Sequence, residues 1–81
     1  MNIVIVDYGA GNLASIKNIL KKAGIQSTIS SDFKVIEDAD KLILPGVGAF
    51  DTCVQKLNDS GLIAVLNKKV LVEKTPLLRI S

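Results

Sequence analysis

The chain has 81 residues, of which 48% are hydrophobic and 22% are charged, a globular composition that excludes an intrinsically disordered chain. Its net charge of +2 comes from scattered lysines, and no aromatic residues alternate with the group Lys17, Lys21 and Lys22. We therefore expect a solvated helix face there and no nucleic-acid partner. One cysteine and no histidine exclude an internal disulfide, a Cys/His zinc site and a histidine-activated nucleophile within these residues. We expect no metal and no cofactor.

The first third of the chain predicts a strand, a turn and a helix. Residues 3–6 form a continuous β-branched run, which is typical of a parallel strand buried on both faces. This run is too short for a signal peptide or a membrane span, so we expect a cytoplasmic protein with no membrane partner. A glycine-rich turn occupies residues 7–12, and apolar residues then recur at helical spacing over 13–23. Gly24 stands where a helix would end in the left-handed conformation.

The middle of the chain predicts a second and a third strand. Residues 25–30 alternate between apolar and polar, as in a strand near the edge of a sheet. Residues 33–39 contain a short helical turn, and residues 41–44 form a third strand that ends at Pro45-Gly46.

The last third predicts helices followed by a fourth strand. Apolar residues at helical spacing mark one helix from Phe50 to Leu57, and Cys53 lies on its apolar stripe, which suits a buried structural thiol. A second stripe runs from Leu62 to Val70, and residues 77–80 form the fourth strand. The connections allow right-handed crossovers, so the order predicts an α/β fold with an incomplete, doubly wound parallel sheet of about four strands, of the flavodoxin-like kind.

The first glycine-rich turn has two readings from its residues alone. Gly9, Gly11 and Ala14 fit a dinucleotide-binding fingerprint between a strand and a helix, and Asp32 lies near the end of the second strand, where an acid would bind a ribose. Nucleotide binding is disfavoured because Asp7 would place a carboxylate close to the pyrophosphate, where like charges repel. The glycines could equally serve only to turn the chain back over the sheet.

The second turn, Leu-Pro-Gly-Val-Gly-Ala-Phe at positions 44–50, also follows a strand directly. Glycines there leave backbone N–H groups open to a ligand. Such donors can stabilise the oxyanion of an acyl-transfer reaction, or they can cradle a phosphate.

Together, Asp-Tyr-Gly-Ala-Gly-Asn-Leu at positions 7–13 and Pro-Gly-Val-Gly-Ala-Phe at 45–50 resemble the glutaminase subunit of imidazole glycerol phosphate synthase. This class I glutamine amidotransferase hydrolyses glutamine and supplies ammonia to a cyclase subunit, its heterodimer partner, in histidine biosynthesis. The resemblance implies that residues 1–81 are the N-terminal part of such a domain. It implies an oxyanion loop made of Gly46, Val47 and Gly48.

The resemblance also implies a surface on the first turn that faces the cyclase subunit or the end of an ammonia tunnel. Its residues are Tyr8, Gly9, Gly11 and Asn12, and Asn12 can at the same time act as the N-cap of the first helix.

The chain departs from the family after Pro-Leu-Leu at positions 76–78. There the family continues into a turn that exposes the catalytic cysteine, whereas this chain reads Arg79-Ile80-Ser81 and places Ser81 at the nucleophile position. The histidine and glutamate of the family's triad have no counterpart in these residues. We therefore expect a truncated or frame-shifted chain that is inactive alone. The alternatives are a non-catalytic docking fragment and a small nucleotide-binding α/β module.

Overall fold

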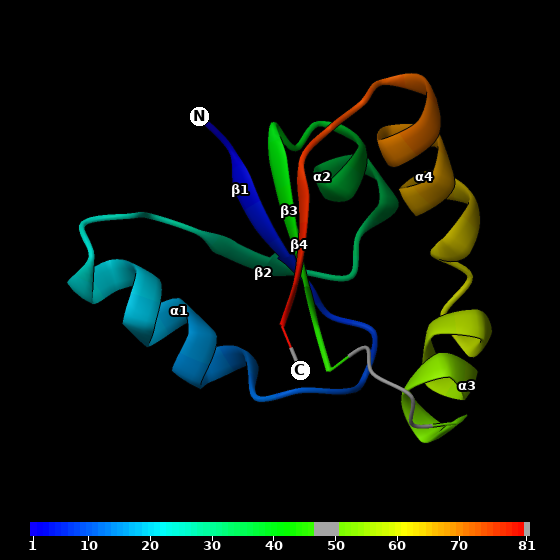
Figure 1. Cartoon of the computed structure of the whole chain (residues 1–81), viewed down its shortest axis with the longest axis horizontal. Coiled ribbons are helices and arrows are strands. Elements are labelled where there is room, and N and C mark those ends of the chain that lie inside the picture. The colour runs from blue at the N-terminus through cyan, green and yellow to red at the C-terminus, as the bar shows by residue number, and fades with distance from the viewer. Residues whose placement is uncertain (47–50, 81) are drawn as a thin grey trace.

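The computed structural model describes residues 1–46 and 51–80, the side chains of 51–54 excepted. Its elements are, in chain order, β1 (Ile3–Val6), α1 (Leu13–Lys22), β2 (Thr28–Ser30), α2 (Phe33–Glu37), β3 (Lys41–Pro45), α3 (Asp51–Asp59), α4 (Ile63–Asn67), a π-helix (Lys68–Val72) and β4 (Leu77–Ile80). The four strands form one sheet in the order β2-β1-β3-β4, and every pair is parallel (Figure 1). The predicted incomplete, flavodoxin-like sheet is confirmed.

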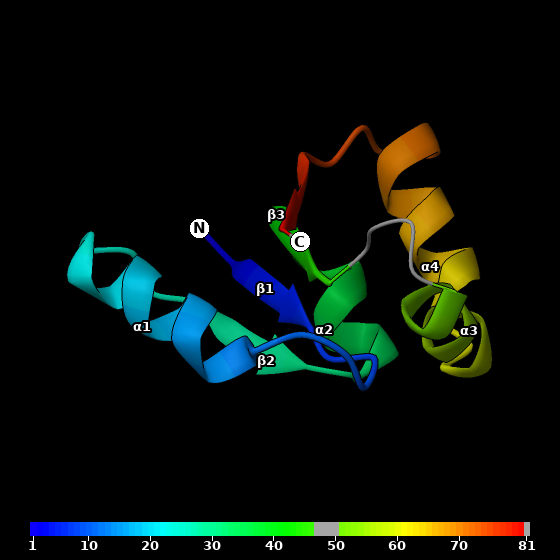
Figure 2. The ribbon, with the colours of Figure 1, turned by 60° about the horizontal axis from the view of Figure 1, so that its bottom comes forward.

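One face of the sheet carries the main core. Alternate residues of the two central strands point to this face, because successive side chains of a strand alternate between faces. They pack beneath α2, α3 and α4, which lie on this side of the sheet (Figure 2). The buried residues of the cluster are Val4, Val6, Tyr8, Ile36, Ala39, Leu42, Leu44, Leu57, Leu62 and Leu66.

Among the described helices, only α1 covers the other face. This helix has no buried residue, and its Ile19 is 66% exposed. An apolar cavity of about 400 Å³ opens between Leu20 of α1 and the strands, beside Leu78 of the edge strand β4. Both faces of a parallel sheet are normally covered, so this face is incompletely packed within the described residues.

The second strand is shorter than the alternation of residues 25–30 predicted. It begins at Thr28 because α1 ends in a Schellman motif: the N–H of Gly24 bonds to the carbonyl of Lys21, and the N–H of Ile25 bonds to the carbonyl of Leu20. Ile25 is therefore held to the helix end and does not pair with β1. The prediction that Gly24 is left-handed is confirmed by its φ of 80°.

The apolar stripe predicted from Leu62 to Val70 is correct only in its first part. Leu62 and Leu66 are buried, but the chain then widens into the π-helix, which exposes Val70 and buries Lys69 instead. A π-turn adds a residue to the helical repeat, so side chains after it face a direction that a 3.6-residue period does not predict. Of the helices in the described ranges, none is long and apolar enough to cross a membrane.

Candidate functional site at the ends of β1 and β3

The two glycine-rich turns lie at the same edge of the sheet. One follows β1 and the other follows β3, and these strands are neighbours. The chain passes from β1 to β2 on one side and then to β3 on the other, so the strand order reverses between β1 and β3. In open α/β sheets this switch point, at the carboxyl ends of the strands, is the usual place for a ligand.

Direct contacts join the turns. The hydroxyl of Tyr8 donates a hydrogen bond to the carbonyl oxygen of Pro45. Gly11 lies so close to this residue that a Cβ on Gly11 would sit 2.7 Å from the Cβ of Pro45. A Cβ on Gly46 would likewise approach the Tyr8 hydroxyl to 3.3 Å. The predicted neighbourhood of the two turns is therefore present, and the turns touch through backbone that only glycine leaves uncovered.

Gly11 and Gly46 also share an unusual backbone conformation. Their φ angles are 92° and 72°, in the region that side chains other than glycine's rarely adopt. Both turns thus need glycine twice over, for the backbone angle and for the close approach.

The first turn is held by contacts from three directions. The N–H of Gly9 donates to a carboxylate oxygen of Asp7 at 3.3 Å. The ammonium of Lys56, in α3, donates to the carbonyl of Gly9 at 2.9 Å. Asn12 caps α1, because its side-chain oxygen accepts from the N–H of Ser15 at 3.2 Å. The N-cap predicted for Asn12 is confirmed.

We expect Asn12→Ala to lower the free energy of unfolding by about 1 kcal/mol, because a free N–H would be left at the start of α1. Asn12→Asp keeps an oxygen acceptor and should cost much less. Urea unfolding followed by far-UV circular dichroism measures both. Equal losses for the two variants would show that the cap does not stabilise α1.

The second turn also touches the end of β4. Pro45 pairs with Ile80, and the N–H of Gly46 donates to the carbonyl of Ile80. The residue before the predicted nucleophile position therefore lies against the start of the predicted oxyanion loop. Val47, Gly48 and Ser81 themselves lie outside the described residues, as does the side chain of Cys53.

Asp7 and Asp32, the two acidic residues considered for nucleotide binding, have other roles in the structure. The Asp32 carboxylate, predicted to bind a ribose, caps α2 by accepting from the N–H of Lys34 at 2.8 Å. The Asp7 carboxylate accepts the hydrogen bond of the Gly9 N–H, which a pyrophosphate would need. Neither residue is arranged for a dinucleotide.

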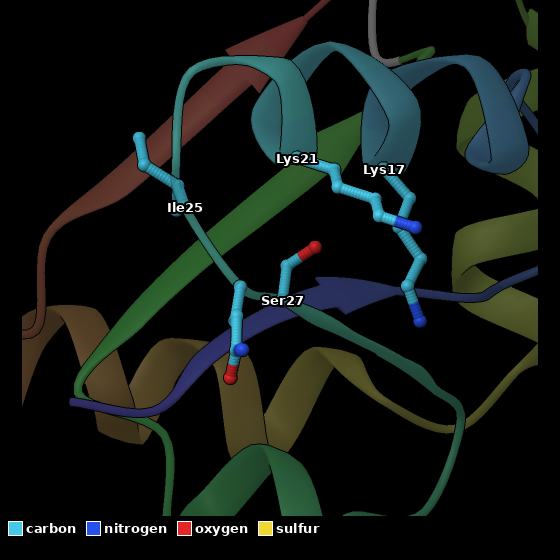
Figure 3. Close-up of a pocket in the computed structure, with 5 residues that line it drawn as sticks. Lys17, Lys21, Ile25 and Ser27 are labelled. Atoms are coloured by element: carbon cyan, nitrogen blue, oxygen red, sulfur yellow. The ribbon is translucent and has the colours of Figure 1, made fainter.

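The lysines of α1 lie away from the turns. Lys17, Lys21 and Lys22 are exposed, as a solvated helix face should be. Lys17 and Lys21 reach over an open cavity of about 300 Å³ between α1 and the segment before β2 (Figure 3). Ser27 lines it as well, and its buried hydroxyl has no hydrogen-bond partner among the described residues. The cavity adjoins the amino end of β2, whereas the two turns lie at the carboxyl ends of the strands.

Lys56 is the residue at the turns that sequence reasoning missed. It lies 47 positions from Gly9, so no local pattern joins the two. The approach of α3 to the first turn is a tertiary contact, and only the fold brings it about.

No protein-family profile matches the chain. Curated relatives do match it. A protein of Methanococcus maripaludis named imidazole glycerol phosphate synthase subunit HisH 2 is 55% identical over 96% of this chain and 39% of its own length. A subunit HisH 2 of Pseudomonas aeruginosa is 49% identical over 94% of this chain and 38% of its own length. A subunit HisH of Pelagibacter ubique is 40% identical over 99% of this chain.

Over nearly its whole length the chain is therefore similar to these HisH subunits. It spans about two fifths of the length of these relatives, 38–40%. By their names, all three are subunits of imidazole glycerol phosphate synthase. The resemblance inferred from the two turns is confirmed, and the match covers the HisH segment in which both turns lie.

Proposed function

We propose that this chain forms the part of a HisH glutamine amidotransferase that carries the oxyanion loop. Such a subunit hydrolyses glutamine in the cytoplasm and supplies ammonia to a cyclase subunit in histidine biosynthesis. The observation that carries the proposal is the junction of three segments at one edge of the sheet. Tyr8 and Gly11 of the first turn touch Pro45, and Gly46 touches Ile80 at the end of β4.

The chemistry requires such a junction. Hydrolysis of the glutamine side-chain amide passes through a tetrahedral intermediate whose oxygen is negatively charged. Backbone N–H groups fixed toward that oxygen are worth about 3–4 kcal/mol each. The N–H of Gly46 is already bonded to Ile80, so in this proposal the donors are the N–H groups of Val47 and Gly48.

The residues of this chain do not supply the rest of the reaction. A serine hydroxyl such as that of Ser81 is a poor nucleophile unless a base activates it, and the chain has no histidine. We therefore expect hydrolysis to need the cysteine and the base that the family carries elsewhere. The 81 residues alone should release no ammonia from glutamine.

The cyclase subunit is the proposed partner, and the first turn is the proposed contact. Gly9, Gly11 and Asn12 are exposed and could face it, but Tyr8 is only 5% exposed. In this proposal Tyr8 therefore acts inside the molecule and does not touch the partner.

A chimera tests the proposal. Residues 1–78 of this chain are joined to the remaining segment of the Methanococcus maripaludis relative, which supplies the family's cysteine, histidine and glutamate. With the cyclase subunit present, the chimera should release ammonia from glutamine at a rate within about tenfold of the intact relative. The matched control carries alanine in place of the family's cysteine and should be inactive. A folded chimera that binds the cyclase subunit but releases no ammonia would overturn the proposal.

A further inference from the structure

We propose that the hydroxyl of Tyr8 is the positioning group that fixes the Pro45–Gly46 peptide, and with it the direction in which the oxyanion loop leaves β3. The inference rests on the proposed function for its catalytic consequence. Its structural part concerns described residues alone.

The ring of Tyr8 is held firmly. It belongs to the buried cluster beneath α2, α3 and α4, although it lies in a turn and not in a strand. From there its hydroxyl reaches across to the next strand and donates to the carbonyl of Pro45, a residue with less than 2% of its surface exposed. A buried carbonyl needs a donor, and the core fixes the position of this one.

The peptide that Tyr8 contacts is held from both ends. Its carbonyl oxygen, on Pro45, accepts from Tyr8, and its N–H, on Gly46, donates to Ile80. Because the peptide group is planar, two hydrogen bonds at opposite ends prevent its rotation about the chain axis.

We call these two hydrogen bonds of the Pro45–Gly46 peptide the clamp. The clamp affects the path of the chain because the residue that follows this peptide bond is a glycine. Gly46 has a φ of 72° and no side chain to restrict its own angles. The held peptide therefore fixes the place and direction from which the chain leaves β3 at Gly46, just before the proposed donors. Donors that stabilise an oxyanion must be aimed before the reaction, since reorganisation during the reaction cancels their benefit.

Substitution of Tyr8 by phenylalanine in the chimera isolates the hydroxyl. Tyr8→Phe keeps the ring in the core and removes the hydroxyl. We expect kcat for glutamine hydrolysis to fall by about 10- to 100-fold with KM changed less than about threefold, the pattern of an interaction made mainly in the transition state.

Ile36→Val is the matched control. Ile36 is fully buried in the same cluster, but it lies in α2, and its backbone bonds with Asp32 and Ala39 involve neither turn. The Ile36→Val substitution should lower stability without altering the clamp, so the kcat of this variant should stay within about twofold of that of the parent chimera. A Tyr8→Phe variant with kcat within twofold of the parent, or an equal fall in Ile36→Val, would overturn the proposal.

Amide hydrogen exchange separates this inference from the proposed function. In Tyr8→Phe, exchange at the Gly46 N–H should accelerate at least about tenfold relative to the Val4 N–H, because local opening becomes easier than opening of the sheet. An unmutated chimera without glutaminase activity would contradict the function and leave this readout to decide the clamp. Unchanged exchange at Gly46 would contradict the clamp whatever the activity.

Discussion

Gly11→Ala should lower the free energy of unfolding by about 2–5 kcal/mol, the largest loss expected for a methyl group added at any of the described glycines. The added Cβ would lie 2.7 Å from the Cβ and 3.4 Å from the carbonyl carbon of Pro45. Pro45 cannot move aside easily, because β3 pairs with β1 on one side and with β4 on the other. The unfavourable φ of 92° adds to the clash. Urea unfolding of the full chain measures the loss.

Gly24→Ala separates the clash from the backbone angle. Gly24 has a similar φ, 80°, but a Cβ there would meet nothing within 4 Å. Its loss should therefore be only the conformational cost, about 1–2 kcal/mol. If Gly11→Ala were no more destabilising than Gly24→Ala, the two turns would not be in contact.

Lys69→Met should lower the free energy of unfolding by about 2–4 kcal/mol, because it leaves carbonyl groups without donors in a buried place. Lys69 as a whole residue is 3% exposed. Its ammonium donates hydrogen bonds of 2.7 Å to the carbonyls of both Glu37 and Ala39. It thereby joins the π-helix to the carboxyl end of α2. Methionine keeps a similar length of apolar chain and cannot donate. Chemical unfolding with fluorescence of Tyr8 or circular dichroism measures the change.

Lys68→Met is the control for charge. Lys68 is the neighbouring residue and forms an ion pair with Glu37 at 3.6 Å, with 56% and 45% of the two side chains exposed. Exposed pairs contribute about 0–1 kcal/mol, so this variant should change stability little. Equal effects of the two substitutions would mean that the buried hydrogen bonds of Lys69 contribute nothing beyond its charge.

Much of the fold follows from patterns that are local in the sequence. The β-branched run at 3–6 predicts β1, the helical spacing from Leu13 predicts α1, and Gly24 predicts its end. These signals succeed because each strand or helix is decided by its own residues and neighbours. The parallel order follows from the lengths of the connections between strands.

The failures lie where a distant contact decides the local structure. The π-helix exists in the register that brings Lys69 to the carbonyls of Glu37 and Ala39, more than 30 positions away for Glu37. A regular helical period predicts that Val70 faces inward. The prediction is wrong because a regular period does not include the wider turn of a π-helix.

The candidate site was predictable in position but not in its internal contacts. Two glycine-rich turns after neighbouring strands indicated a shared edge, and the family resemblance gave that edge a chemistry. No pattern in the sequence indicates the hydrogen bond from Tyr8 to Pro45, and the resemblance implies for Tyr8 only a surface that faces the cyclase subunit or the end of an ammonia tunnel. A tyrosine in a turn looks exposed until the fold shows that the core encloses its ring.

The most direct test of the central claim is a nuclear Overhauser spectrum of the isotope-labelled chain. The α-protons of Gly11 should show cross-peaks to the β-protons of Pro45, since a Cβ at Gly11 would lie 2.7 Å from that carbon. Cross-peaks from Gly11 that stay within residues 7–13, in a chain whose β1–β3 cross-peaks are intact, would contradict the contact between the turns and the glutaminase half-site built on it.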